Sequence, residues 1–527
     1  MTAAAAAGTN PGLRGAGHRA LNILLLLALW EAAARAMAGS HLLAGPVAVA
    51  GYLWQNSGLM GRALAVTLEN AAWGFVLGNL AAVALALLAL ALPRLRGLVS
   101  GLALVVFCLP LVATGPILRV LYGPGAGPQI TIAALAVYYT TYIPLMVGLR
   151  AAPASWFDLM RIYGRGGVTA LVQVRAMAAL PYLLAGLQIA APAAFLGAMI
   201  GEFTGAERGM GVLAIRAMRG LDVEATWALA TLAAAVAMLA YGLLGLIASR
   251  LVPDRPEALL APPPARGGGG PLAALAMGGL TLLAALALWW GAMEAFGLNR
   301  FFAKRPDDLW RFLATAPQAE TSRAILLAAL AETLRETVPG YAAGLMLGAG
   351  LAAGLCLWPA MAGAVLPVAI ALRSVPIVTT APLIVLALGR GSAGTMAIVA
   401  VMTFFPALVA CIHGLRQTPG QVLDLFETYA AGRWRLLLHA RLPAMLPAFF
   451  ASARMSVPAA FLAVTVAEWL ATGRGIGTLM ATSASTSNYN MLWSSVAALT
   501  LVAALAYAAV AAVERAALMR LAPEQLR

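Results

Sequence analysis

Glu202 and Glu468 each end a long uncharged apolar stretch, where a carboxylate could gate or contact a solute. The first stretch reads PAAFLGAMIGEFTGAERGMG from residue 192, and the second reads PAAFLAVTVAEWLATGRGIG from residue 458. A charge at the centre of a bilayer costs at least about 2.5–3.5 kcal/mol, but one near the interface costs much less. Two interpretations therefore stay open: a functional acid in a pathway, or an interfacial acid that caps a helix or pairs with Arg208 and Arg474.

A pair of glycines follows each glutamate at the same distance, Gly209 and Gly211 in the first stretch and Gly475 and Gly477 in the second. Glycine lets the backbone fold back closely against neighbouring helices. The pattern fits a re-entrant segment at the mouth of a translocation pathway. It fits a plain turn equally well, so both interpretations stay open.

Other polar residues inside or beside apolar stretches are weaker candidates for the pathway. Thr114 and Thr380 offer hydroxyls, although a threonine in a helix more often bonds back to its own backbone. Arg119 lies near the predicted outer end of its helix, where it could attract an anionic solute. Arg373 and Arg454 are predicted to extend to the cytoplasmic interface, as long basic side chains in membranes do.

The sequence carries no pattern typical of an enzyme. The four histidines lack metal-ligand spacing, and no Ser/His/Asp, paired-carboxylate or Cys/His set is present. No G-x-x-x-x-G-K-[ST] phosphate loop occurs, so we expect the chain alone neither to bind nor to hydrolyse ATP. Cys108, Cys356 and Cys411 lie in apolar surroundings and are predicted to be small buried hydrophobes. We expect no catalytic residue, metal or cofactor in this chain.

Composition indicates a membrane protein. The 527 residues are 62% hydrophobic and 10% charged, with a mean hydropathy of +0.88, whereas soluble domains carry about 25% charged residues. Runs of about 18 uncharged apolar residues can cross a bilayer as helices, and the alternation of a membrane barrel is missing. The uncharged blocks are 70–93, 120–149, 176–201, 225–249, 267–293, 337–372 and 489–513.

The net charge of +14 follows membrane topology and does not indicate a nucleic-acid partner. Arginines concentrate in alternate gaps between the apolar blocks, whereas the intervening gaps mix acids and bases. This asymmetry is the positive-inside pattern, and it predicts that both termini are cytoplasmic. Because Glu31 and Arg35 interrupt the approach to the Ala-Met-Ala at 36–38, we expect a retained first helix rather than a cleaved signal peptide.

The chain is an internal duplication. From about residue 67 to residue 241, the first half maps onto the second at a constant shift of 266 residues, the separation of Glu202 and Glu468. Scarce residue types are matched in this way, which argues against coincidence in an Ala- and Leu-rich chain. Examples are Thr67 with Thr333, Pro110 with Pro376, Pro116 with Pro382, Trp227 with Trp493 and Tyr241 with Tyr507.

We therefore predict two domains, 1–252 and 271–527, joined by a cytoplasmic Pro- and Gly-rich linker at 253–270. Each domain holds about six spanning helices, and an even number makes the two copies parallel, with a pathway between them. The predicted spanning cores are 20–37, 70–92, 98–121, 129–149, 177–201, 226–249, 272–293, 337–357, 361–388, 393–415, 444–467 and 490–513.

Two charged stretches, 150–176 (knob 1) and 416–442 (knob 2), are predicted to face the cytoplasm. Each has an acid, continues as a short amphipathic helix and is then broken by a glycine, which would present a compact surface protrusion. An ordinary solvated loop is the alternative for either stretch alone, but the recurrence in both halves argues against it. The residues singled out are Asp158, Tyr163, Gly164 and Arg165 in knob 1, and Asp424, Glu427, Tyr429, Gly432, Arg433, Leu442 and Pro443 in knob 2.

Both knobs resemble the EAA loop of binding-protein-dependent ABC importer permeases, in which an acid is followed by a glycine and later by Leu-Pro. Asp158 and Gly164 match in knob 1, and Asp424 and Leu442-Pro443 match in knob 2. Ala430 replaces the usual glycine of knob 2, Ala176-Met177 replaces the Leu-Pro of knob 1, and both acids are Asp rather than Glu. The stretches after the knobs resemble the sulfonate, taurine and nitrate branch, which has a glutamate followed by a Gly-x-Gly turn.

The resemblance implies an all-α membrane protein of about 12 transmembrane helices, with two permease domains fused in tandem in the type I importer fold. It also implies two cytoplasmic ABC ATPase subunits that bind ATP and Mg and receive the knobs, and a periplasmic solute-binding protein. The function would be import of a small solute, which could be anionic, across a bacterial inner membrane by alternating access. The alternative is an ion-coupled secondary transporter with two six-helix halves, which would need buried acids for its relay. The sequence does not identify the solute.

Overall fold

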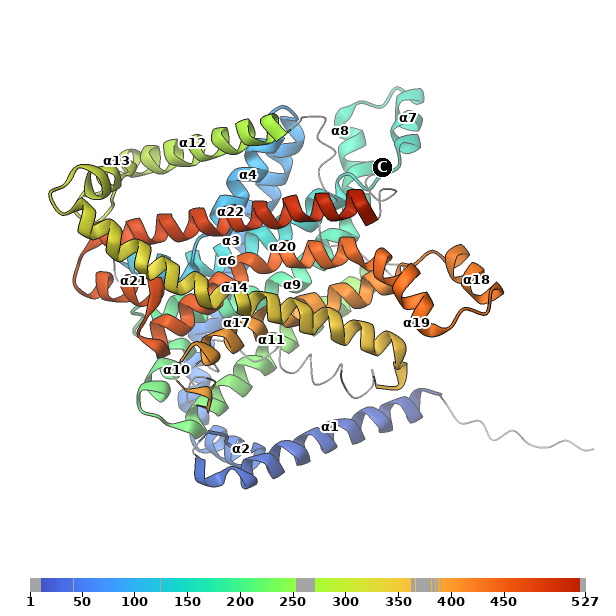
Figure 1. Cartoon of the computed structure of the whole chain (residues 1–527), viewed down its shortest axis with the longest axis horizontal. Helices are drawn as coiled ribbons and strands as arrows, with labels where there is room; N and C mark the ends of the chain where they lie inside the picture. Colours follow the sequence, from blue (N-terminus) through green and yellow to red (C-terminus); the bar gives the residue numbers. More distant parts are fainter. Residues whose placement is uncertain are drawn as a thin grey trace, which may run out of the picture.

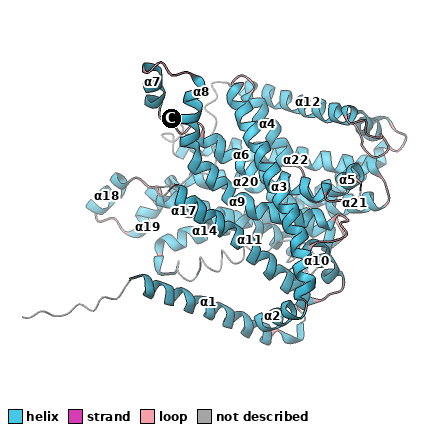
Figure 2. Ribbon diagram, turned by 180° about the vertical axis from the view of Figure 1, so that it is seen from behind, coloured by secondary structure: helices cyan, strands magenta, loops and turns pink. Residues whose placement is uncertain are grey.

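The structure is a computed structural model that describes residues 11–40, 42–123, 125–252, 271–361, 365, 381, 384, 387–389 and 391–521. Within these ranges the regular elements are all helices (Figure 2). Nine of the described helices are long and apolar enough to span a membrane, and the number is ten if one bent helix pair crosses as a single broken span. The predicted all-α membrane fold is confirmed.

The first half contains eleven α-helices in its described part. Their bounds are α1 (Pro11–Ala36), α2 (Pro46–Gln55), α3 (Ser57–Ala91), α4 (Arg96–Phe107), α5 (Leu111–Tyr122), α6 (Gly127–Gly148), α7 (Ala154–Ile162), α8 (Gly167–Thr169), α9 (Ala176–Phe203), α10 (Met210–Arg219) and α11 (Val223–Leu251). A π-helical turn, Ala170–Arg175, leads into α9.

The second half repeats this order in its described part. Its helices are α12 (Pro271–Ala295), α13 (Pro306–Trp310), α14 (Ala319–Leu357), α17 (Ser392–Arg416), α18 (Gly420–Thr428), α19 (Arg433–Leu436), α20 (Leu442–Ala467), α21 (Gly475–Ser485) and α22 (Tyr489–Leu521). A π-helical turn, Leu437–Arg441, leads into α20, and another, Glu468–Thr472, follows it. The predicted core 361–388 lies largely outside the described residues.

The core predicted at 98–121 is not a single helix. The chain forms α4 and α5 there, and the two helices are bent by 90°. Pro110 lies at the break. Proline has no N–H to donate, and its ring clashes with the preceding helical turn. A helix therefore cannot continue through a proline without strain. Its carbonyl accepts from Ala113 N at 2.9 Å and thereby starts α5.

Glycines allow the long helices of each half to approach closely. On α14, a Cβ added at Gly344 would lie 2.0 Å from Thr403 Oγ1 and 2.5 Å from the Ala400 carbonyl oxygen of α17. On α3, a Cβ at Gly78 would lie 2.6 Å from the Ala134 carbonyl oxygen of α6. Small residues at helix contacts are the usual basis of packing in membranes, where water does not drive association.

We expect Gly344→Ala to destabilise the protein by about 1–3 kcal/mol, because α14 and α17 must move apart to admit the methyl group. Gly350→Ala is the matched control on the same helix, since a Cβ there meets nothing within 4 Å. That change should be neutral or should stabilise by up to about 1 kcal/mol. Thermal unfolding in detergent compares the two variants, and equal midpoints would contradict the packing argument.

The two halves share one apolar core. Residues of α5, including Val112, Ala113 and Ile117, belong to the same cluster as Val464 of α20 and Leu499 of α22. Helix α5 contacts α20 and α21, and α12 packs against α4 across the boundary between the halves. The bent pair α4–α5 therefore joins the halves.

The molecule has two distinct ends. Helices α7 and α18 project from the right-hand end in Figure 1, whereas α10, α13 and α21 lie at the left-hand end. The described chain also begins (α1) and finishes (α22) toward the right-hand end. Knobs 1 and 2 therefore lie on one side of the bundle, as the sequence predicted, and we call this side the knob end.

Candidate functional site

Glu202 is held in a polar cradle at the end of α9. Its carboxylate accepts from Thr67 Oγ1 at 2.8 and 3.0 Å and from the Gly211 amide at 2.7 Å. Thr67 in turn accepts from the Met210 amide at 2.8 Å. These contacts (cradle 1) fasten the N-terminus of α10 to α3 and α9.

Glu468 is held in the same way in the second half. Thr333 Oγ1 donates to its carboxylate at 2.7 Å, and the Gly477 amide donates at 2.7 Å. The Ile476 amide donates to Thr333 at 2.9 Å. In this second set (cradle 2), Glu332 also accepts from the Gly475 amide at 3.2 Å.

The glycines of the cradles are required by space as well as by backbone shape. Gly209 has φ 127° and Gly475 has φ 77°, conformations that other residues rarely adopt. A Cβ at Gly211 would lie 2.4 Å from the Met199 carbonyl oxygen, and one at Gly477 would lie 2.7 Å from the Thr465 carbonyl oxygen. Helices α10 and α21 therefore fold back against α9 and α20, which fits the re-entrant interpretation.

Both glutamates are buried, with 1% of Glu202 and 2% of Glu468 exposed. The partners that the structure describes for their carboxylates are threonines and backbone amides. These contacts fit an acid that caps a helix, and they do not support the predicted pairing with Arg208 and Arg474. The sequence argument did not assign Thr67 and Thr333 to this site. Their match at the 266-residue shift was the available signal.

The other pathway candidates are spread over the molecule. Thr114 is buried at the boundary between the halves and donates to the Leu111 carbonyl at 2.8 Å, the helix-internal bond that its type favours. Arg119 is half-buried near the C-terminal end of α5. Thr380 and Arg373 lie outside the described residues.

Arg454 does not reach the interface, contrary to the sequence prediction. It is buried, and its Nε lies 2.8 Å from Oε2 of Glu514 on α22, an ion pair rather than an aligned hydrogen bond. Glu514 lies one residue beyond the uncharged block 489–513, within the long helix α22.

The helices of the two knobs end with the same backbone geometry. After α7, Arg165 N donates to the Met160 carbonyl at 2.9 Å and Gly164 N donates to the Arg161 carbonyl at 3.0 Å. After α18, Ala431 N donates to the Phe426 carbonyl and Ala430 N to the Glu427 carbonyl, both at 2.9 Å. This is the Schellman motif, which needs a residue in the left-handed region.

Glycine fills the left-handed position in knob 1, where Gly164 has φ 63°, but Ala430 fills it in knob 2 with φ 47°. A left-handed non-glycine residue costs about 1–2 kcal/mol. The duplicated fold therefore keeps the knob shape even where the usual glycine is missing.

Ala430→Gly is expected to stabilise the end of α18 by about 1 kcal/mol, because it removes this strain. Gly164→Ala should weaken the end of α7 by a similar amount. Hydrogen–deuterium exchange of the amides at positions 431 and 165, which close the two motifs, should slow about fivefold in the first variant and accelerate in the second. Unchanged exchange in both variants would contradict the strain argument.

The knobs present large apolar side chains to solvent. Tyr163 is 71% exposed and Tyr429 is 77% exposed, and each directly follows its helix. Leu159 and Leu425, which match at the same shift, are also exposed. Exposed apolar side chains that are repeated at one end of a molecule indicate a contact surface.

The two knobs differ in charge. Arg161 pairs with Asp158 at 3.2 Å in knob 1, whereas Glu427 occupies the position of Arg161 in knob 2, beside Asp424. The remaining predicted residues lie on the return to the spanning helix: Gly432 precedes α19, Arg433 starts it, and Leu442 and Pro443 start α20.

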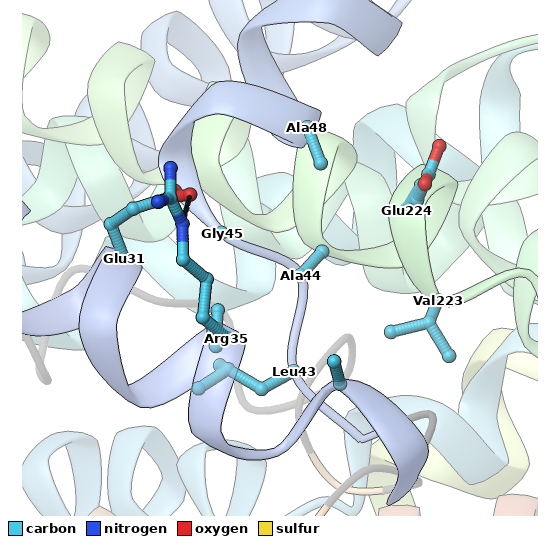
Figure 3. A pocket seen from close by; sticks show the side chains of 10 residues that line it. Glu31, Arg35, Leu43, Ala44, Gly45, Ala48, Val223 and Glu224 are labelled. Carbon is cyan, nitrogen blue, oxygen red and sulfur yellow. Dashed lines mark hydrogen bonds and ion pairs between the residues drawn. The ribbon is translucent and has the colours of Figure 1, made fainter.

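A cavity of about 250 Å³ lies apart from both sites, where α1, α2 and the start of α11 meet (Figure 3). Glu31 and Arg35 form an ion pair at 2.8 Å in its wall, and Glu31 also accepts from the Val47 amide at 3.4 Å. Its lining comes from residues 31–48 and 223–224, all in the first half. The cavity therefore lies outside the boundary between the halves, where the pathway is predicted.

Comparison with protein families matches this chain twice. The model for the binding-protein-dependent transport system inner membrane component matches residues 74–256 and 344–521. The two matched segments contain the two knobs and the two cradle glutamates.

Individual relatives give the same picture. The chain is 36% identical over 148 residues to a probable ABC transporter permease protein of Haemophilus influenzae, a match that covers 28% of this chain and 60% of that protein. It is 34% identical over 114 residues to the formylaminopyrimidine transport permease protein ThiX of Halalkalibacterium halodurans, covering 22% and 46%. It is 30% identical over 108 residues to the putative aliphatic sulfonates transport permease protein SsuC of Escherichia coli, covering 20% and 41%. The matched part thus spans roughly half the length of these relatives.

Proposed function

Because the chain belongs to the family of binding-protein-dependent transport system inner membrane components, with two permease domains in tandem, we propose that it is the complete membrane-spanning part of one ATP-driven importer. Two ATPase subunits would bind ATP and Mg at the knob end, and a solute-binding protein would deliver solute at the opposite end. The knob end and both termini would then be cytoplasmic in a bacterial inner membrane.

The observation that carries the proposal is the pair of knobs. Both project from one end of the bundle, both end in the same backbone motif, and both expose a tyrosine at the matching position. A motor built from two similar subunits needs two similar contacts, which the duplication supplies within one polypeptide. We expect one copy of this chain and two ATPase subunits per transporter.

The proposed mechanism is alternating access. ATP-driven closure of the two motor subunits would move the knobs relative to each other. Each knob continues through a π-helical turn into a long spanning helix, α9 or α20, so its displacement would tilt that helix. The cradles fix the far ends of α9 and α20 to the re-entrant helices α10 and α21, which would carry the motion to the solute-entry side.

The solute is proposed only by class. The relatives are named for formylaminopyrimidine and aliphatic sulfonate transport, and both are small organic molecules. We propose a small organic solute, with an anion as the narrower proposal because Arg119 lies half-buried near the boundary between the halves.

An ion-coupled secondary transporter would use a buried acid as a proton or ion relay. Glu202, Glu468 and Glu514 are buried, but the first two are held by backbone amides and threonines and the third by an arginine. These contacts support structural roles for the acids, and family membership supports an ATP-driven importer.

Purification from native membranes in lipid nanodiscs tests the proposal. We expect two ABC ATPase chains for each copy of this chain by intact-complex mass measurement. ATP hydrolysis should be present in the complex and missing from the isolated polypeptide. ATPase activity of the isolated polypeptide, or solute uptake that follows a proton gradient without ATP, would overturn it.

A further inference from the structure

The cavity between α1, α2 and the start of α11 has opposite charges on its walls. Arg35 lies at one wall, where its Nε donates to Glu31 at 2.8 Å, and Glu224 lies at the other (Figure 3). The Arg35 side chain is 76% exposed, and no described residue accepts from its terminal amino groups. Glu224 is exposed, and its carboxylate has no partner among the described residues. The cavity therefore offers N–H donors on one side and a carboxylate on the other.

The cavity lies where the apolar parts of two helices end. Glu31 is the first charged residue after the uncharged run 20–30 of α1, and Glu224 directly precedes the uncharged block 225–249 of α11. Trp30 and Trp227 meet here, with ring centres 5.8 Å apart, and tryptophan is enriched at membrane interfaces. The cavity is therefore at the depth of the lipid headgroups, at the end of the molecule opposite the knobs.

Helix α1 leaves much of its apolar surface uncovered by protein. Its main helix contact is with α2, and Leu24 and Leu29, which point roughly 140° apart around the helix, are 63% and 59% exposed. Helix α11 exposes a row of leucines at helical spacing, Leu239, Leu243 and Leu246. Both apolar surfaces continue from the cavity toward the knob end, and acyl chains cover such surfaces in a bilayer.

The equivalent place in the second half is found through the paired tryptophans. The Trp227 indole donates to the Leu42 carbonyl at 3.1 Å. Trp493, its match in the second half, donates to the Phe302 carbonyl at 2.8 Å. The two acceptors are 302 − 42 = 260 residues apart, so the halves match in this loop at 260 residues instead of 266.

The second half fills this place with an arginine side chain. At the 260-residue shift Gly45, which precedes α2, matches Arg305, which precedes α13, and a proline follows each. Arg305 is buried and its Nε donates to Glu294 at 2.7 Å. Gly45 has no side chain, and a Cβ there would lie 2.4 Å from Oε2 of Glu31. The open cavity is thus a departure of the first half from the duplicated pattern.

We propose that this cavity binds the headgroup of a phospholipid that carries ethanolamine, with its acyl chains along α1 and α11. The phosphate would accept from Arg35, because a guanidinium matches phosphate oxygens in charge and geometry. The ammonium would donate to Glu224. The bound lipid would attach α1 to the bundle beyond its contact with α2. This site goes beyond the importer function, and only its assignment to the external leaflet rests on the proposed cytoplasmic position of the knobs.

The test is native mass spectrometry of the full chain in detergent. The chain is titrated with palmitoyl-oleoyl phosphatidylethanolamine, phosphatidylcholine or phosphatidylglycerol, and the fraction that retains one lipid gives the affinity. We expect about tenfold higher affinity for phosphatidylethanolamine, because a choline has no N–H to donate and a glycerol has no positive charge.

Two variants separate the two contacts. Arg35→Gln should weaken the binding of all three lipids about tenfold, because it removes the contact to the phosphate that they share. Glu224→Gln should weaken only phosphatidylethanolamine, to the level of phosphatidylcholine. Both side chains are exposed, so the variants should fold, and the Glu224 variant carries the test if Arg35→Gln does not.

Glu320→Gln is the matched control, because Glu320 is also an exposed acid in the first turn of a long helix, α14. It should leave phosphatidylethanolamine binding unchanged. Equal affinities of the parent chain for the three lipids, or equal losses in Glu224→Gln and Glu320→Gln, would overturn the site. Displacement of the lipid by an equimolar amount of soluble glycerophosphoethanolamine would overturn the assignment to a membrane lipid.

The outcome is independent of the proposed importer function, because the measurement uses neither ATPase subunits nor solute uptake. Loss of the lipid site would leave that function standing. Conversely, a complex that lacks ATPase subunits would refute the importer function without altering lipid retention.

Discussion

Replacing Glu468 by alanine is expected to reduce solute uptake about tenfold, because the variant leaves a buried backbone amide without an acceptor at the start of α21. The Gly477 amide and the Thr333 hydroxyl both donate to this carboxylate at 2.7 Å. Thr333 keeps a second acceptor, the Ala329 carbonyl at 3.1 Å, so the Gly477 amide is the donor left unsatisfied, at a cost of about 1–3 kcal/mol. Since net stabilities are typically about 5–15 kcal/mol, this loss should loosen helix α21 from α14.

Glu468→Gln separates the structural role from a role of the charge. A glutamine can accept from the Gly477 amide through its oxygen and donate to Thr333 through its nitrogen. Thr333 can then keep donating to the Ala329 carbonyl at 3.1 Å. If the cradle is structural, the glutamine variant should keep most of the uptake and thermal stability that the alanine variant loses.

Glu202→Ala should behave like Glu468→Ala, since cradle 1 has the same partners at matching positions. Uptake and protein level are measured together in membranes with the complete transporter. Normal uptake by the Glu202→Ala/Glu468→Ala double variant would contradict the cradle argument. If the glutamine variants instead lose uptake while their thermal stability is unchanged, the negative charge of the carboxylate takes part in gating.

The sequence was sufficient to predict the class of fold and its duplication, because both follow from features that need no side-chain contacts. Uncharged blocks of spanning length predict helices in a bilayer. A constant shift that matches Trp227 with Trp493 predicts equivalent positions, and both indoles donate to a backbone carbonyl of the segment before α3 or α14. The protrusion of both knobs was also predicted, since their acid, short helix and basic residues recur at the same shift, although the turn of knob 2 is made by Ala430 rather than by a glycine.

What the sequence could not predict depends on which side chains meet. Pro110 was visible, but a proline can kink a helix or end it, so its presence alone did not predict the 90° bend between α4 and α5. Arg454 was predicted to reach the interface because its partner, Glu514, is 60 residues away in the chain. Thr67 and Glu202 are 135 residues apart, so nothing local indicated their contact.

Removing Tyr163 and Tyr429 together is expected to abolish assembly with the ATPase subunits while leaving the membrane domain intact. Both side chains are more than two-thirds exposed, so Tyr163→Ala and Tyr429→Ala should each change folding stability by no more than about 0.5 kcal/mol. Tyrosines in the centre of an interface commonly contribute about 2 kcal/mol or more, which is about 30-fold in affinity for each knob. Co-purification of the ATPase and thermal unfolding of the chain measure the two effects separately.

Trp54→Ala is the matched control, because Trp54 is also a highly exposed aromatic residue but lies on α2, away from the knob end. It should retain the ATPase subunits. The single variants also compare the knobs, whose charges differ at the position of Arg161 and Glu427. If the two single variants lose the ATPase subunits to the same extent, the tyrosines dominate both contacts. If the double variant retains both ATPase subunits, force enters the membrane domain elsewhere, and the proposed coupling through the knobs fails.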